Sequence, residues 1–114
     1  MTPLKQIYET LKQAGIPVYF PGQHTGIGMT PYVVLREGET KPNGTNLTGT
    51  TAFELIAYAP IHNYTGLTGL TDLIRQALKP LVHIRPTGRV YGQGIESEYQ
   101  MHRVILEYEA QRRL

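Results

Sequence analysis

Residues 50–59 carry the strongest structural signal in the sequence, a stretch rich in Thr, Phe, Ile and Tyr that ends at Pro60. Successive side chains of a β-strand point to opposite faces of the sheet. The odd-numbered residues from 53 to 59 are all apolar, whereas the even-numbered ones from 54 to 58 are Glu, Ile and Tyr. This segment therefore predicts a strand with one face in a hydrophobic core and a second face that mixes apolar and charged side chains.

Two other segments divide in the same way. Residues 32–36 begin after a proline and place Val33 and Leu35 on the core side. Residues 99–109 form a long last strand, in which every second residue from His102 to Tyr108 belongs to the more apolar set. We expect these two strands to lie in the same sheet as residues 50–59, with their apolar sets on the same side.

Shorter strand signals occur in two further places. Residues 18–20 predict a short strand that stops at Pro21. Residues 81–84 and 89–91 indicate two pieces of one strand, interrupted at Pro86 to Gly88 and followed by a turn at residues 92–94.

Two segments space their apolar residues by three and four positions, which is typical of amphipathic helices. The first begins at Pro3, after Thr2 as its N-cap, and ends near Ala14. The second runs from about residue 64 to residue 78 and stops before Pro80. Because both helices have a single apolar side, we expect both to pack on the core face of the sheet.

These elements predict one α+β domain that spans residues 1–114, in the order α-β-β-β-α-β-β. The chain length is typical of a single domain, and 40% apolar with 18% charged residues is an ordinary globular balance. Connections of hairpin length favour a mainly antiparallel sheet. Neither an export signal nor a segment of 18 apolar residues is present, so we expect no membrane span.

The second face of the predicted sheet mixes aromatic, aliphatic and charged residues in a way that is typical of protein interfaces. It is too apolar for a fully solvated surface and too charged for a core, and a thin core makes further burial against partners favourable. We therefore predict an oligomer interface on this face. The residues assigned to it are Tyr32, Val34, Arg36, Glu54, Ile56, Tyr58, Met101, Arg103 and Ile105.

The segment from Gly38 to Gly49 consists mostly of Gly, Thr, Asn, Pro and Lys, which predicts a long loop without a packed element. Long loops in compact domains are often functional. One interpretation is a contact arm that uses Lys41, Asn43, Asn46 and Leu47, and the other is a mobile hairpin connection without a binding role.

The sequence contains none of the patterns that usually mark a catalytic, cofactor or metal site. It has no cysteine, and no pair of its four histidines has the spacing of three or four residues that places two imidazoles on one metal ion. The glycines at 22, 26 and 28 do not match a phosphate-binding loop. Glu96 and Glu98 lie two residues apart at a turn and could bind a cation, but a solvated hairpin end is the preferred interpretation. We expect no catalytic residues, no cofactor and no bound metal. A net charge of +2 without a basic cluster does not indicate specific nucleic-acid binding.

The chain resembles the tail-completion, or tail-terminator, proteins of long-tailed bacteriophages. The resemblance extends from the first helix to the last strand and rests on three segments. These are Pro31 to Leu35 (PYVVL), Phe53 to Pro60 (FELIAYAP) and Leu70 to Leu78 (LTDLIRQAL). They are packing segments and carry no chemical signature.

This resemblance implies a structural protein without enzymatic activity that forms a hexameric ring at the head-proximal end of the tail tube. Such a ring ends tail growth and offers the surface to which the head is joined. The implied partners are further copies of the chain, the tail tube protein and the head connector protein. The implied location is the virion tail, and the bacterial cytoplasm during assembly.

Three alternatives come from outside this interpretation. The chain could be another neck or head-closure component, or a small ligand-binding α+β domain with its pocket at residues 22–30. It could also be a small nucleic-acid-binding protein, whose affinity would fall steeply with salt.

Overall fold

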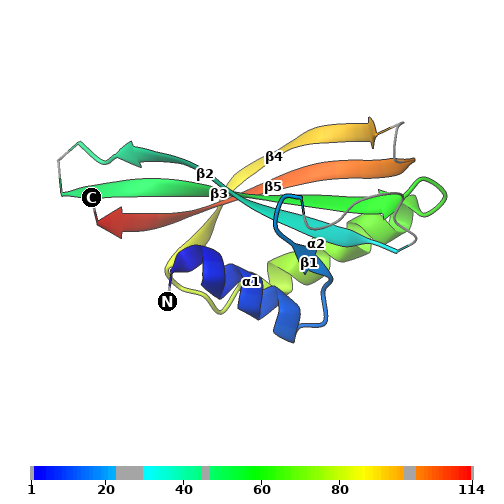
Figure 1. The fold of residues 1–114 in the computed structure, drawn as a ribbon, viewed down its shortest axis with the longest axis horizontal. Helices are drawn as coiled ribbons and strands as arrows, with labels where there is room; N and C mark the ends of the chain where they lie inside the picture. The colour runs from blue at the N-terminus through cyan, green and yellow to red at the C-terminus, as the bar shows by residue number, and fades with distance from the viewer. Residues whose placement is uncertain (1, 23–29, 45–46, 97–99, 114) are drawn as a thin grey trace.

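The computed structural model describes residues 2–22, 30–44, 47–96 and 100–113 as an α+β domain with two helices and a five-stranded sheet (Figure 1). The observed order of elements is the predicted α-β-β-β-α-β-β. The elements are α1 (Pro3–Gln13), β1 (Val18–Tyr19), β2 (Tyr32–Pro42), β3 (Thr48–Pro60), α2 (Tyr64–Leu78), β4 (Ile84–Glu96) and β5 (Met101–Arg113).

Both helices begin where local side chains cap them. Thr2 accepts a hydrogen bond from the backbone N–H of Lys5 at 3.3 Å, and Pro3 occupies the first turn, where a missing N–H costs nothing. At the start of α2, the Asn63 side chain accepts a hydrogen bond from the N–H of Gly66 at 3.1 Å. The predicted extents of both helices are confirmed to within about one residue.

The strands lie in the order β1-β2-β3-β5-β4, with every pair antiparallel except β1 and β2, which are parallel. β3 and β5 form the central pair of the sheet, and their pairing runs without interruption over the whole of both strands. In the described residues, β1 pairs with β2 at Val33 and Val34. The sheet is therefore mainly antiparallel, as predicted, with one short parallel pair at its edge.

The helices cover one face of the sheet, as Figure 1 shows. The core lies between the helices and the sheet and contains the apolar set predicted for each long strand except His102, which is only partly buried. Ile7 and Leu11 of α1 and Ile74 and Leu78 of α2 are essentially inaccessible to solvent. Their partners on the sheet are Val33, Leu35, Phe53, Leu55, Ala57, Ala59, Val104, Leu106, Tyr108 and Ala110. The sequence therefore assigned the core face correctly.

The segment from Gly38 to Gly49 is a β-hairpin for most of its length, and the prediction of a loop without a packed element was wrong. β2 continues to Pro42 and β3 begins at Thr48, with one irregularity between Glu37 and Thr40. The hydroxyls of Thr40 and Thr51 are 2.7 Å apart across this hairpin. Figure 1 shows β2, β3 and the end of β5 extending past the helices, in a molecule 47 Å long.

β4 also differs from the prediction. β4 is one strand from Ile84 to Glu96, in which Pro86 to Gly88 and the predicted turn at residues 92–94 are irregularities of register rather than breaks. Residues 81–83 precede this strand and do not belong to it.

No described helix is long and apolar enough to cross a bilayer.

Candidate interaction surface

The face of the sheet opposite the helices carries no described helix, and its side chains form rows that cross the strands. One row contains Val34 of β2, Ile56 of β3, Ile105 of β5 and Tyr91 of β4, since these residues are paired in register. We call this side of the sheet the open face. Val34, Ile56 and Ile105 are each partly exposed, so this apolar row is accessible in a single chain.

A second row on the open face is charged. Arg36, Glu54 and Glu107 lie opposite one another on β2, β3 and β5. The Arg36 guanidinium donates to one Glu54 carboxylate oxygen, with its Nε at 2.8 Å, and the Tyr91 hydroxyl donates to the other. Both oxygens of this carboxylate therefore have a donor.

This arrangement changes the proton affinity of both groups. The hydrogen bond from Tyr91, aided by the Arg36 charge, holds the pKa of Glu54 below its ordinary value, although partial burial acts in the opposite direction. Burial, followed by the hydrogen bond to Glu54, raises the pKa of Tyr91 to about 12. At neutral pH Glu54 is thus ionised and Tyr91 is a neutral donor.

The guanidinium groups of β4 and β5 extend the network along the face. Arg89 lies over the ring of Tyr91, 4.3 Å from its centroid, and 3.6 Å from the Glu107 carboxylate. Arg103 donates from Nε to the backbone oxygen of Gly92 at 3.0 Å and forms an ion pair with Glu96. Surface ion pairs contribute little to stability one at a time, so the main effect of this network is to fix side-chain positions.

Between the hairpin and β4 the open face is hollowed into a groove of about 460 Å³. Four carboxylates and two cationic side chains line it, together with the Tyr91 ring. The charged lining residues are Glu39, Lys41, Glu54, Arg89, Glu107 and Glu109. An incoming partner would therefore meet a polar surface whose central groups already have partners within the chain.

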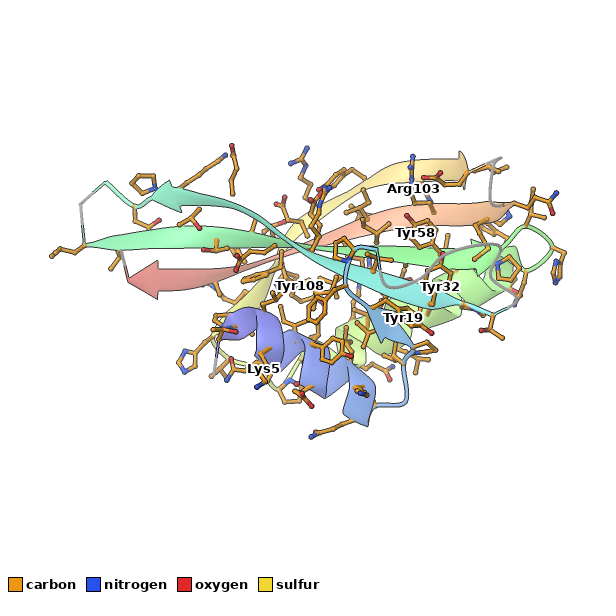
Figure 2. The ribbon with its side chains drawn as sticks, in the orientation of Figure 1. Lys5, Tyr19, Tyr32, Tyr58, Arg103 and Tyr108 are labelled. Atoms are coloured by element: carbon orange, nitrogen blue, oxygen red, sulfur yellow. The ribbon has the colours of Figure 1, made fainter. Side chains whose placement is uncertain are left out.

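Seven of the nine residues predicted for the interface lie on the open face and reach its surface, and two do not. Tyr32 is only 7% exposed because its ring stacks on Tyr58 at 5.0 Å and meets the edge of Tyr19 at 5.9 Å (Figure 2). Met101 is fully buried at the start of β5, between Pro60 of β3 and Glu96 of β4. Neither side chain can offer much surface to a partner, so assigning them to the interface was a mistake.

Three of the four residues predicted for the contact loop are described. Lys41 is exposed on β2, opposite Thr50. The side-chain oxygen of Asn43 accepts a hydrogen bond from the Thr50 hydroxyl at 2.7 Å, which ties it to the hairpin. Leu47 is 72% exposed, and Asn46 lies outside the described residues.

In the part of the chain that the structure describes, no three His, Asp or Glu side chains gather as they would around a metal ion. His102 makes a hydrogen bond of 3.0 Å through Nε2 to the backbone oxygen of Ile61, and its ring meets Tyr64 edge to face at 5.0 Å. Glu96 is paired with Arg103, whereas Glu98, His24 and the glycines at 26 and 28 lie outside the described residues.

An apolar surface near His102 was missed from the sequence. Ile61, Tyr64 and Ile95, which lie around His102, and Val90, farther along β4, are each between 45% and 56% exposed. Val90 and Ile95 face the helix side of β4, because they lie opposite Leu106 and His102, but they remain accessible to solvent. The only available signal was the apolar character of Ile95 beside a predicted turn.

A comparison with protein-family models finds no match to this chain, and a comparison with curated proteins finds none either.

Proposed function

We propose that the protein is a structural subunit of a homo-oligomeric ring at the head-proximal end of a long-tailed bacteriophage tail. In this role it has no catalytic activity, and the ring ends tube growth and receives the head connector. The observation that carries the proposal is the open face, where a partly exposed apolar row lies beside a row of fixed charges. Non-obligate interfaces have this combination of an apolar centre and a polar surround.

The edges of the sheet add a second argument. In the described part of the chain, β2 has no neighbour on its outer side beyond Val34, and β4 has none along its outer side. These two edges differ in sequence and lie at opposite ends of the strand order of one sheet. A ring requires two different surfaces that fit each other head to tail, and a sheet with two unlike edges can supply them.

The projecting hairpin suits contact with a tube or connector. It extends beyond the helices, carries Lys41 and Leu47 near its tip and is held to β5 along β3 (Figure 1). A paired hairpin loses less conformational entropy on binding than a free loop of the same length. The proposed contact arm therefore has a preformed conformation before it binds.

Analytical ultracentrifugation of the purified chain over a wide concentration range, followed by electron microscopy, tests the proposal. A specific ring contact needs about 800 Å² of buried surface per partner, which gives a mass that rises with concentration. Ile56→Asp, at the centre of the apolar row, should abolish this rise. Leu73→Asp is the matched control, since Leu73 is 54% exposed on α2, away from the open face.

Circular dichroism must show that both variants remain folded. An Ile56→Asp variant that is folded and still assembles like the unchanged chain would refute the choice of face. A chain that stays monomeric alone and also fails to join purified tail tubes would refute the ring. Electron microscopy of particles would place the protein at the end of the tail or at another position in the neck.

A further inference from the structure

A second hollow lies on the other side of the molecule, where the end of α2 meets the start of β4. It measures about 310 Å³ and lies beside the core. Leu78 and Ile84 form its apolar floor with Tyr108, which Figure 2 shows on the helix side of the sheet. Each of these three side chains is at most 3% exposed, so the floor is a fixed part of the fold.

The rim of this hollow is basic. Arg75, Lys79 and Arg85 all line it, and none of its described lining residues is a carboxylate. Arg75 and Lys79 also belong to the end of α2, where cations are favoured by the helix dipole. That explanation does not extend to Arg85, which reaches the same rim from β4. Three positive charges around an apolar floor thus come from two separate elements.

Two of these cations have weak partners within the chain. The nearest Arg75 nitrogen is 3.7 Å from the Asp72 carboxylate, and the nearest Arg85 nitrogen is 3.8 Å from Glu109. Both arginine side chains remain at least 50% exposed. Exposed pairs of this kind contribute little, so the guanidinium groups can turn toward an incoming carboxylate at small cost.

The shape of the hollow selects the kind of occupant. Val82, on its lip, is 75% exposed, so the hollow is shallow on that side. Small-molecule sites usually enclose most of their ligand, which a shallow hollow cannot do. A single apolar side chain that projects from a partner protein fits better, since such anchors fill small pockets at the centre of interfaces.

We propose that this basic hollow binds an acidic segment of a partner protein, with one aromatic or large aliphatic side chain on the apolar floor and flanking carboxylates on the cations. We call this site the basic hollow. Its floor is Leu78, Ile84 and Tyr108, and its rim is Arg75, Lys79, Val82 and Arg85. This inference does not depend on the ring, because the hollow lies on the helix side and not on the open face. Burial raises the pKa of Tyr108, so its hydroxyl stays neutral and can donate to a carboxylate.

The test uses the full chain labelled with nitrogen-15 and three blocked tripeptides followed by two-dimensional NMR. The probe is acetyl-Glu-Phe-Glu-amide. One control peptide replaces both Glu residues by Gln, and the other replaces Phe by Ala. We expect the probe to shift the amide signals of residues 75–86 and of β5 around Tyr108, and each control peptide to bind at least about fivefold more weakly.

Variants locate the effect. Lys79→Glu should weaken binding of the probe about fivefold or more, and Val82→Asp should weaken it more than Lys79→Glu does. Both residues are exposed, so we expect both variants to fold. Lys12→Glu makes the same change of net charge on the exposed end of α1, near the opposite end of α2, and should leave binding unchanged.

Three results of the peptide titrations would overturn the proposal. These are shifts that map elsewhere, equal binding of the Gln peptide, and no shift at millimolar probe. Signals of residues 75–86 that move with protein concentration alone would identify a second copy of the chain as the occupant, which would also overturn it.

Discussion

Three glycines of β4 allow a sharp test of how the open face is packed. Gly88 and Gly92 have positive φ angles of 84° and 67°, whereas Gly94 does not have a positive φ. A Cβ added at Gly92 would lie 2.8 Å from Cδ1 of Ile105, and one added at Gly88 or Gly94 would meet no atom of the described residues within 4 Å. Substitution by Ala therefore introduces backbone strain alone at Gly88, and backbone strain together with a clash against Ile105 at Gly92. At Gly94 it introduces neither.

The expected costs follow from these geometries. A left-handed backbone costs an L-residue about 1 to 2 kcal/mol, partly offset by the smaller entropy of the unfolded chain. Gly88→Ala should therefore lower the free energy of unfolding by about 1 kcal/mol. Gly94→Ala should change it little or raise it by up to about 1 kcal/mol. At Gly92, moving the end of the Ile105 side chain adds about 0.5 to 1.5 kcal/mol, for a total of about 2 kcal/mol.

Urea unfolding followed by circular dichroism, at one protein concentration for all variants, measures these differences. The decisive comparison is a double-mutant cycle between Gly92→Ala and Ile105→Val, because Val lacks the Cδ1 atom that would clash. The valine variant should recover part of the cost of Gly92→Ala. If Gly88→Ala and Gly92→Ala lower the free energy of unfolding equally, and Ile105→Val recovers none of the loss at Gly92, then Ile105 does not pack on Gly92 as described.

Two further predictions concern buried groups. Because the folded-state pKa of Glu54 is lowered, its carboxylate stabilises the fold above the ordinary pKa, and this contribution is lost as the pH falls through the lowered value. Urea unfolding between pH 6 and pH 3 should thus depend less on pH in Glu54→Gln, with exposed Glu39→Gln as a control that keeps the original slope. Met101→Ala should lower the free energy of unfolding by about 2 to 5 kcal/mol, since Met101 is fully buried. Ile95→Ala, at a residue 56% exposed, should change it by about 0.5 kcal/mol or less, and similar losses for both would contradict the burial of Met101.

The helices and the two faces of the sheet could be predicted because their signals are local. Thr2 and Asn63 cap the helices through residues three positions away. The alternation of side chains within residues 53–59 is sufficient to assign each one to the core face or to the open face, whichever strands pair with this one. These features follow from the sequence without any knowledge of tertiary contacts.

The hairpin could not be predicted because its stability comes from distant pairing. Glycine, asparagine and proline disfavour a strand locally, but Thr48 to Thr51 pair with residues 110–113 of β5 on one side and with β2 on the other. Those backbone hydrogen bonds override the local preference. The C-terminal end of β5, which the sequence placed at residue 109, lies at Arg113 and provides the pairing partners of Thr48 to Thr51.

The candidate surface could be predicted only in part for a related reason. Alternation places Tyr32 and Met101 on the open face but does not reveal which neighbours cover them there. The stack of Tyr32 on Tyr58 and the position of Met101 between two strands both depend on register. The apolar surface around Ile95 was missed because no periodic pattern includes it.

The irregular pairing of β4 has a consequence for how copies could associate. A straight, regular edge strand would accept another strand without limit and would favour fibres. In β4, the register shifts after Pro86 and again after Tyr91 interrupt the regular spacing of outward-facing amide groups, and Pro86 has no amide hydrogen to donate. An approaching strand could pair with this edge only over short stretches. Growth by endless strand addition is thus disfavoured, which leaves closed assemblies of defined size as the better outcome for a molecule with this edge.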